Sequence, residues 1–307
     1  MIVLWGVLED GPLAAVHDAL LQIGGAPVFF ANQRDTLDTE IDLVVSGDIG
    51  GTLRIRDQKC DLDAVQGVYV RCYDSRELPA VVEAGDGSAA WHHAVGIDDA
   101  LNSWLDLTPA LVVNRPSAMA SNNSKPYQAS KIRSLGFAIP DTLITTDPLA
   151  AKEFWERHGT VIYKSISGVR SIVSRLGSMH ADRFADVAWC PTQFQQYIPG
   201  NDCRVHVVGD EVFACEIVSE ADDYRYAGRN GIDVDIRPCD LPQNCADRCR
   251  ALAASLSLTV AGIDLRRAPD GRWYCFEVNP SPGFTYYEAA TNQPIAKAIA
   301  HHLISAS

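Results

Sequence analysis

The sequence lacks two features: an apolar run long enough to cross a membrane, and an excess of positive charge. Its 307 residues carry 26 lysines and arginines against 39 aspartates and glutamates, which gives a net charge of −13. A surface of this sign repels the phosphate backbone of nucleic acids and anionic lipid headgroups. Residues 1–7 are typical of a strand and have no basic leading region of the kind that opens a secretory signal. We therefore expect a cytoplasmic protein with no nucleic-acid partner and no membrane partner.

Cysteine pairs with metal-ligand spacing are also missing, although the sequence has nine cysteines. No Cys-x-x-Cys occurs, and Cys245 and Cys249, four residues apart, have no pair of histidines nearby. Scattered cysteines with apolar neighbours are typical of reduced core residues in a cytosolic protein. The spacing favours this interpretation over a disulfide framework or a zinc site.

Two common phosphate-binding motifs are absent as well. The sequence contains neither Gly-x-Gly-x-x-Gly nor Gly-x-x-x-x-Gly-Lys-Ser/Thr. Residues 1–113 instead alternate between apolar strands and amphipathic helices, which predicts a small α/β domain. The expected strands are 2–7, 27–31, 67–71 and 110–114, the expected helices are 12–23 and 89–107, and an expected hairpin joins 42–46 to 52–56.

Residues 114–198 hold two lysines beside segments that suit phosphate binding. Lys125 lies in an expected helical region, 121–139, which Lys125-Pro126 interrupts and Gly136 ends, and Lys164 ends an expected strand. The loop after Lys164 includes Ser167 and Gly168, small residues that let backbone N–H groups approach phosphate oxygens, while a lysine adds a compact positive charge. An ordinary β-turn with an exposed lysine is the alternative. The other expected elements are strands 140–145, 160–164, 172–175 and 192–198, and helix 147–158.

Residues 199–307 are expected to form two hairpins and two helices. Asp202 and Arg204 share one face of their strand, which is compatible with a surface salt bridge between them. The charged and aromatic stretch 219–229, which contains Arg225, is either a loop over a site or a solvated connector. The expected hairpins join 201–208 to 212–218 and 259–267 to 272–278, and the expected helices are 243–258 and 288–304.

The last of these hairpins gathers possible metal ligands. Pairing of its strands can bring Asp264 near Glu277 and Asn279, and alternation along the second strand puts the latter two on one face. Two carboxylates and an amide oxygen form a hard, oxygen-only site that suits Mg²⁺ and, through it, phosphate. The spacing alone is equally compatible with a solvated hairpin whose polar side chains point outward.

The motifs follow one another in a characteristic order: a lysine, a strand-end lysine with a glycine loop, Gln-Gln-Tyr-Ile, Asp-x-Arg, and Asp followed by Glu-x-Asn-Pro-Ser-Pro-Gly. From about residue 114 to the C-terminus, this order resembles the ATP-grasp superfamily. The specific resemblance is to its RimK-like branch of glutamate ligases, glutathione-synthetase relatives and ligases that cross-link microviridin-type ribosomal peptides. The resemblance implies an α/β (α+β) ATP-grasp fold in three parts: a pre-grasp α/β domain (1–113), a central subdomain with the phosphate loop (114–198) and a C-terminal subdomain with the metal site (199–307).

The resemblance also assigns roles in ATP binding. Lys125 and Lys164 resemble the two lysines that contact ATP, and the loop with Ser167 and Gly168 resembles the one that closes over its phosphates. Asp202 resembles the acidic residue near the ribose or the phosphates. Residue 196 departs from the pattern, since many relatives carry Glu there. The segment that corresponds to the adenine hinge is Gln195, Gln196, Tyr197 and Ile198.

For the metal and the chemistry, the resemblance implies two further sets. The implied Mg²⁺ ligands are Asp264, Glu277 and Asn279. The arginines that could face the γ-phosphate or a substrate carboxylate, and so act in catalysis, are Arg204, Arg225 and Arg266.

The implied activity is ATP-dependent ligation of a carboxylate to an amine or a hydroxyl through an acyl phosphate, with release of ADP and phosphate. ATP and Mg²⁺ are the expected cofactors, and a peptide or an amino acid is the expected substrate. The oligomeric state is open, with a homodimer as one candidate. Two other functions fit the same motifs: an ATP-grasp phosphotransferase acting on a small molecule, and a non-catalytic module that binds ATP or a peptide.

Overall fold

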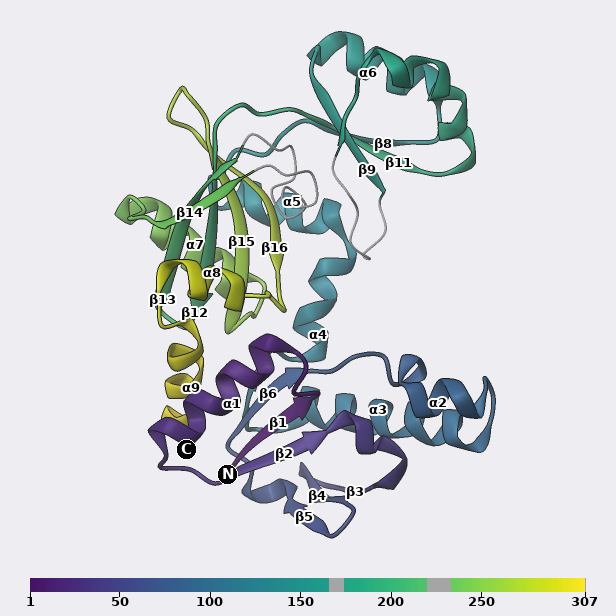
Figure 1. Ribbon diagram of the computed structural model, residues 1–307, viewed down its shortest axis with the longest axis vertical. Coiled ribbons are helices and arrows are strands. Elements are labelled where there is room, and N and C mark those ends of the chain that lie inside the picture. The colour runs from purple at the N-terminus through teal and green to yellow at the C-terminus, as the bar shows by residue number, and fades with distance from the viewer. Residues whose placement is uncertain (166–173, 220–232, 307) are drawn as a thin grey trace.

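The computed structural model of the protein describes residues 1–165, 174–219 and 233–306, and in these residues four sheets carry helices packed on them (Figure 1). Ser167, Gly168 and Arg225 lie outside the described residues. The mixture of parallel and antiparallel sheets with helices confirms the predicted α/β (α+β) class.

The first sheet is parallel, with the strand order β2-β1-β6-β7. Its strands are β1 (Ile2–Gly6), β2 (Val28–Asn32), β6 (Gly67–Arg71) and β7 (Leu111–Val113), and its helices are α1 (Gly11–Ile23), α2 (Pro79–Ala84) and α3 (Ala89–Leu107). Side chains alternate along β1, so Val3 and Trp5 share a core with α3, whereas Ile2 and Leu4 share one with α1. The predicted strands and helices of this domain are confirmed to within two residues at each end.

A small antiparallel sheet, ordered β3-β4-β5, packs beside the first one. It consists of β3 (Thr39–Ser46), β4 (Asp48–Ile55) and β5 (Gln58–Asp61). The predicted hairpin is confirmed but is longer than expected, because the turn contains Gly47 alone, at a φ of 98°. Strand β5 was not predicted, because Gln-Lys-Cys-Asp is short and polar. Short 3₁₀ segments join these elements: η1 (Gln33–Asp38), η2 (Leu62–Ala64) and η3 (Ser75–Glu77).

The central sheet is antiparallel, in the order β10-β9-β11-β8, and stands apart from the rest as the upper right lobe of Figure 1. It contains β8 (Thr142–Thr145), β9 (Val161–Ser165), β10 (Ser174–Arg175) and β11 (Thr192–Gln196), with α6 (Pro148–His158) and the 3₁₀ segment η5 (Ser178–Trp189). Asp147 caps α6 by accepting a hydrogen bond from the Leu149 N–H, and Gly159 ends it.

The helical region expected over 121–139, interrupted at Lys125-Pro126 and ended at Gly136, is confirmed in outline. The chain forms α4 (Pro116–Met119), η4 (Ala120–Asn123) and α5 (Lys125–Ser134). Ser124 has an extended backbone and caps α5 through its side chain, so the helix can begin only at Lys125. Gly136, at a φ of 82°, ends the turn that follows, and Ala138 then pairs with Tyr274.

The C-terminal sheet is antiparallel, with the order β14-β13-β12-β15-β16. It contains β12 (Asn201–Val208), β13 (Glu211–Ser219), β14 (Val234–Pro238), β15 (Val260–Arg267) and β16 (Trp273–Asn279), and α7 (Gln243–Ser255) covers one face. Both predicted hairpins are confirmed. The predicted single helix 288–304 was wrong: α8 (Thr285–Thr291) and α9 (Ile295–Ser305) are separated at Asn292, which is left-handed, and Pro294.

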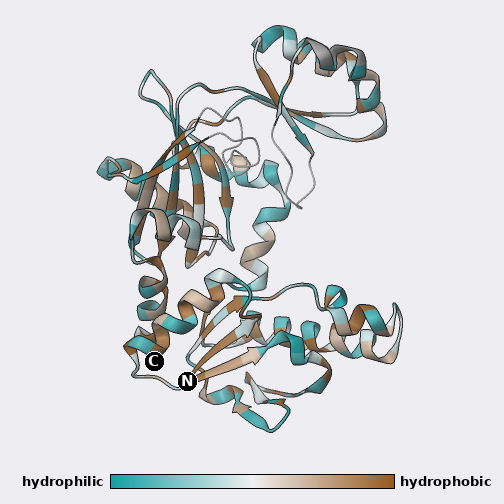
Figure 2. Ribbon diagram, in the orientation of Figure 1, coloured by the Kyte–Doolittle hydropathy of each residue, from teal (hydrophilic) through white to brown (hydrophobic). Residues whose placement is uncertain are grey.

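Helix α9 packs against α1 and completes the core of the first sheet. Ile295, Ile299 and Leu303 are fully buried together with Ile2 and Leu13. The N- and C-terminal ends consequently lie close together in Figure 1, and Figure 2 shows hydrophobic residues along the strands that face these cores. The predicted domain boundaries after residues 113 and 198 stay a prediction. The last helix, α9, shares its core with the first sheet, so the end of the sequence packs on its N-terminal part. Across the described ranges, no helix combines the length and the apolarity needed to traverse a bilayer.

Candidate active site

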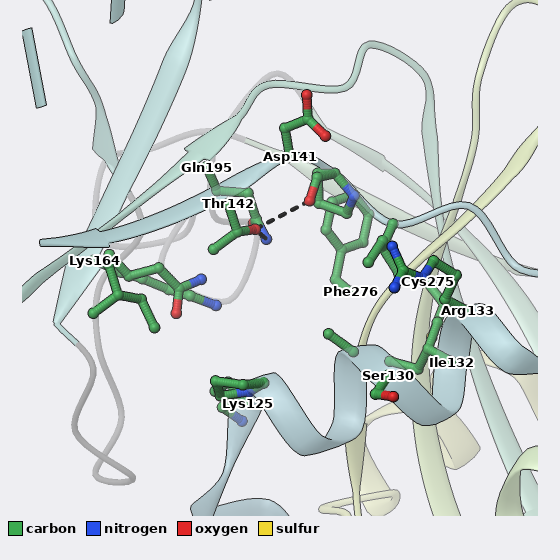
Figure 3. A pocket seen from close by; sticks show the side chains of 16 residues that line it. Lys125, Ser130, Ile132, Arg133, Asp141, Thr142, Lys164, Gln195, Cys275 and Phe276 are labelled. Carbon is green, nitrogen blue, oxygen red and sulfur yellow. Dashed lines mark hydrogen bonds between the residues drawn. The ribbon is translucent and has the colours of Figure 1, made fainter. Parts of the chain in front are cut away.

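A cleft of about 400 Å³ lies between the central sheet and the C-terminal sheet (Figure 3). One wall consists of α5 and β16, and the other consists of β8, β9 and β11. Lys125 lines it from α5 and Lys164 from β9, so the cleft brings the two lysines of the sequence motifs together. The other residues that line it are Pro126, Ala129, Ser130, Ile132, Arg133, Ile139, Pro140, Asp141, Thr142, Ile144, Gln193, Gln195, Cys275 and Phe276.

Lys125 connects the cleft to the predicted metal ligands. Its ammonium lies 3.3 Å from Glu277 Oε2 and donates a hydrogen bond of 3.1 Å to Asn122 Oδ1. The lysine is the first residue of α5, so its position depends on the Ser124 cap. Its side chain and that of Glu277 are each about one-quarter exposed (25% and 29%), which leaves both accessible to a ligand.

Asp264 and Glu277 are direct partners in the pairing of β15 with β16. The register shifts next to them, between Asp264 and Leu265, and such a bulge turns the side chains of a strand away from a regular alternation. Asn279 lies opposite Gly262, and its Oδ1 accepts a hydrogen bond of 2.9 Å from the Ser281 N–H. One edge of the C-terminal sheet therefore presents two neighbouring carboxylates and a fixed amide oxygen.

These donors fit Mg²⁺. The ion takes oxygen ligands, usually one or two protein carboxylates, with water and phosphate oxygens completing its octahedron. Within the described part of the chain, no group of three or more His, Cys, Asp or Glu side chains could hold a metal ion. The amide oxygen of Asn279 is a candidate third ligand beside the two carboxylates. Both carboxylates already face cations, Arg204 for Asp264 and Lys125 for Glu277.

Arg204 is held beside the carboxylate pair by its surroundings. Its Nη1 donates to Asp264 Oδ1 at 2.6 Å, and its Cζ lies 5.6 Å from the centre of the Tyr287 ring. Burial and the charge of Arg204 lower the pKa of His206 well below its usual value, so the ring is neutral and can accept the hydrogen bond from Arg204 Nε (3.4 Å). A Cβ on Gly262 would overlap Arg204 Nη2, so the guanidinium occupies space that any other residue at 262 would fill.

Arg266 and Asp202 pair with each other and not with the groups that the sequence suggested. Arg266 is not among the described residues that line the cleft, and both carboxylate oxygens of Asp202 accept hydrogen bonds from it, at 2.7 and 2.9 Å. The salt bridge suggested between Asp202 and Arg204 is replaced by pairs with β15, since the register sets Asp202 opposite Arg266 and Arg204 opposite Asp264.

Of the four hinge residues, only Gln195 lines the cleft, where its side chain donates to Thr142 Oγ1 at 3.2 Å. The N–H groups of Gln196 and Tyr197 donate to carbonyls of Asp141 and Thr160. Ile198 is buried, at 3% exposure. Alternation along β11 explains why Gln193 and Gln195 share the cleft face, and this signal was available in the sequence.

The cleft also contains residues that the sequence analysis missed. Phe276 and Cys275 line it from β16, and Thr142 and Ile144 line it from β8. Figure 3 shows Phe276 on the same side of the cleft as Arg133 and away from Lys125 and Lys164. Ile139, Pro140 and Phe276 give the lining an apolar part. No motif in the sequence indicated these residues, because their contribution depends on how two sheets face each other.

Known proteins resemble this chain in sequence. The family model of the RimK-like ATP-grasp domain matches residues 133–303. A probable alpha-L-glutamate ligase of Xylella fastidiosa (strain M12) is 31% identical over 275 residues, which cover 83% of this chain and 87% of that protein. A probable alpha-L-glutamate ligase 2 of Hahella chejuensis is 27% identical over 165 residues, 51% of this chain and 50% of that protein. For the Hahella protein and a Xanthomonas euvesicatoria relative, the chain spans about half the length of the relative (50% and 46%).

Solved structures resemble it over nearly its whole length. The macrocyclase MdnC of Microcystis aeruginosa, bound with its precursor peptide MdnA, has a TM-score of 0.82 and 24% identity, covering 99% of this chain and 100% of that one. The ATP-grasp ligase PsnB, complexed with a phosphomimetic minimal precursor, Mg and ADP, has a TM-score of 0.80 and 25% identity, covering 99% and 98%. The shared architecture therefore includes the first sheet, the central sheet and the C-terminal sheet.

Proposed function

The chain belongs to the RimK-like ATP-grasp family, and on that premise we propose that it is an ATP-dependent ligase that joins a carboxylate to an amine or a hydroxyl. The family model covers more than half of the residues, and the relative from Xylella matches over most of both chains. The family and the fold expected from the order of motifs are confirmed by these matches.

One observation carries the proposal: the cationic region of the cleft is continuous with the carboxylate pair. Lys125 lines the cleft and is 3.3 Å from Glu277, which pairs with Asp264. Lys164 lines the same cleft from the opposite wall. A nucleoside triphosphate needs this combination, an apolar region for its base, cations for its phosphates and hard oxygen ligands for its metal.

We assign the residues as follows. Asp264, Glu277 and Asn279 would hold Mg²⁺, which when bound would neutralise charge on the phosphate oxygens. Lys125 and Lys164 would bind phosphate oxygens from the two walls. Arg204, oriented by His206 and Tyr287, is positioned to stabilise negative charge close to Asp264.

The reaction requires no protein nucleophile. An oxygen of the substrate carboxylate attacks the γ-phosphorus of ATP, and the bond to ADP breaks, which leaves an acyl phosphate. The amine or hydroxyl of the second substrate then attacks the acyl carbon, phosphate leaves, and the proton of the nucleophile passes to solvent. The enzyme contributes orientation and fixed charge, which are the main sources of rate enhancement in phosphoryl transfer.

A peptide or an amino acid is the proposed substrate class. The relatives are named as probable glutamate ligases, and the MdnC and PsnB structures contain precursor peptides. These names support a substrate that carries amino-acid carboxylates.

Mass spectrometry tests the function directly. The protein is incubated with ATP, Mg²⁺ and candidate peptides or amino acids, and each product is weighed. Loss of one water per new bond, together with ADP release that depends on the second substrate, is the expected result. A product that gains phosphate would establish a phosphotransferase instead, and tight ATP binding without any turnover would establish a binding module.

A further inference from the structure

Arg266 joins the segments through which the chain passes from the central sheet to the C-terminal sheet. Its Nη1 donates to the Ile198 carbonyl at 2.7 Å, just after β11. Its Nε and Nη2 donate to the two oxygens of Asp202, in β12, at 2.7 and 2.9 Å. The guanidinium therefore connects both ends of the Pro199-Gly200 crossing to β15 with three charge-assisted hydrogen bonds.

The backbone at Gly200 also keeps the segment between β11 and β12 close to β15. Gly200 has a φ of 139°, and a Cβ there would overlap the carbonyl oxygen of Arg267, so the chain crosses β15 at a distance that only glycine allows. Asp202 and Arg266 are direct partners in the pairing of β12 with β15. The side chain of Arg266 is 15% exposed and that of Asp202 26%, which limits competition from water.

The Arg266 guanidinium also contacts an aromatic residue of the cleft wall. Its Cζ lies 5.3 Å from the centre of the Phe276 ring, and Phe276 lines the cleft. It also lies 5.7 Å from the ring of Tyr197, whose hydroxyl accepts a hydrogen bond of 3.0 Å from Arg175 Nη2. Arg266 thus contacts residues of the hinge and of the cleft wall but is not itself among the described residues that line the cleft.

We propose that Arg266, paired with Asp202, is a positioning residue for the nucleoside end of ATP. The pair fixes the β11–β12 crossing and the Phe276 ring, and so keeps the apolar region of the cleft in shape for the base. In this role Arg266 contacts neither the γ-phosphate nor the substrate carboxylate. The inference rests on the proposed function, because it requires that the cleft binds ATP.

Titration calorimetry with AMP, ADP and ATP distinguishes a nucleoside role from a phosphate role. Arg266→Ala should weaken the binding of all three nucleotides by a similar factor, about tenfold, because the lost support lies at the part that they share. The matched control is Arg267→Ala, an exposed arginine one residue further along β15, which should leave the three affinities unchanged. A loss that grows from AMP to ADP to ATP would mean that Arg266 contacts phosphate, and unchanged affinities would mean that the pair does not position the nucleoside.

Two further variants keep the test valid if Arg266→Ala disturbs folding. Asp202→Asn retains the size of the side chain and should reproduce most of the loss, and combining it with Arg266→Ala should add little. Arg266→Lys retains the charge but not the planar fork, so it should restore little of the affinity; full restoration would contradict the geometry proposed here.

Kinetics supply a second readout. Arg266→Ala should raise the KM for ATP with little change in kcat, because a positioning role acts on binding. A fall in kcat at saturating ATP would overturn the proposal. If the unchanged protein itself binds no nucleotide, the proposed function fails and this inference fails with it, whereas nucleotide binding that Arg266→Ala does not alter overturns only the inference.

Discussion

The α5 and β16 wall of the cleft rests on a large apolar core, whereas the β8, β9 and β11 wall rests on a small one. In the described ranges, the core under β16 contains 17 buried residues and that of the central sheet contains five. The outer edge of β16 is also covered: Gln128 exchanges two hydrogen bonds with the Val278 backbone, and Ala138 bonds to the backbone of residues 273 and 275.

The chemistry follows this difference. The carboxylates that fit the metal, Arg204 and Lys125 all belong to the wall with the large core or contact it, where more buried apolar contacts oppose local opening than in the central sheet. The opposite wall contributes Lys164 and Gln195. A site that must hold opposite charges at fixed distances is thus built on the more stable part of the molecule, and the less stable part supplies groups that meet the ligand from across the cleft.

Truncating the small core should have the largest effect. Phe154 is buried at 6% exposure against Val161, Val187 and Phe194, so Phe154→Ala should destabilise the central sheet by about 3–5 kcal/mol. Hydrogen exchange should become fast in β8, β9 and β11 while β12 and β15 stay protected. Leu149→Ala, an exposed position in the same helix, is the control, and uniform loss of protection in both sheets would contradict two separately stable walls.

Removing a metal ligand from the other wall should strongly reduce turnover without unfolding. Glu277→Gln and Asp264→Asn should each lower kcat by about 10²–10³-fold, since fixed charge at the phosphates is lost. ADP release measures the effect, circular dichroism checks the fold, and Glu211→Gln, an exposed carboxylate in β13, is the control. Full turnover in either variant would remove the metal assignment.

Uncovering the edge of β16 should have a moderate effect. Gln128 is 1% exposed, and Gln128→Ala would leave the N–H and C=O of buried Val278 without their side-chain partner, at a cost of about 1–3 kcal/mol. Urea unfolding measures the loss. Ser134→Ala, at an exposed position of α5, should change stability by less than about 0.5 kcal/mol; equal effects of the two variants would mean that the edge is not supported by Gln128.

The smallest expected effect is at the junction of the two walls. Tyr197→Phe removes the hydroxyl that accepts from Arg175 and keeps the ring beside Arg266, so it should cost about 0.5–1 kcal/mol. Thermal unfolding of this variant and of Tyr197→Ala should separate the hydroxyl from the ring. A hydroxyl deletion as costly as removal of the ring would mean that the stacking contributes nothing.

Local signals in the sequence predicted much of the fold. The bounds expected for β6, β12 and α3 agree with the structure, because strand alternation and the Ser88 cap of α3 are properties of neighbouring residues. The failure at 288–304 occurred where left-handed Asn292 and then Pro294 interrupt an otherwise helical composition.

The candidate site was less accessible to prediction. The sequence identified Lys125, Lys164 and the Asp264–Glu277 pair, because each stands in a motif. It could not tell which arginine faces which carboxylate, since strand register decides that Arg204 meets Asp264 and Arg266 meets Asp202. The sequence did not indicate Phe276 either, because it lines the cleft only as a result of how two sheets face each other.

The packing of α9 on the first sheet bears on the order in which the chain folds during synthesis. A ribosome adds about 5–20 residues per second, so residues 295–305 emerge on the order of ten seconds or more after the strands they cover. Throughout that interval Ile2, Leu4 and Leu13 have no complete apolar partner surface. The core of the first sheet is therefore completed only after the rest of the described chain has been made.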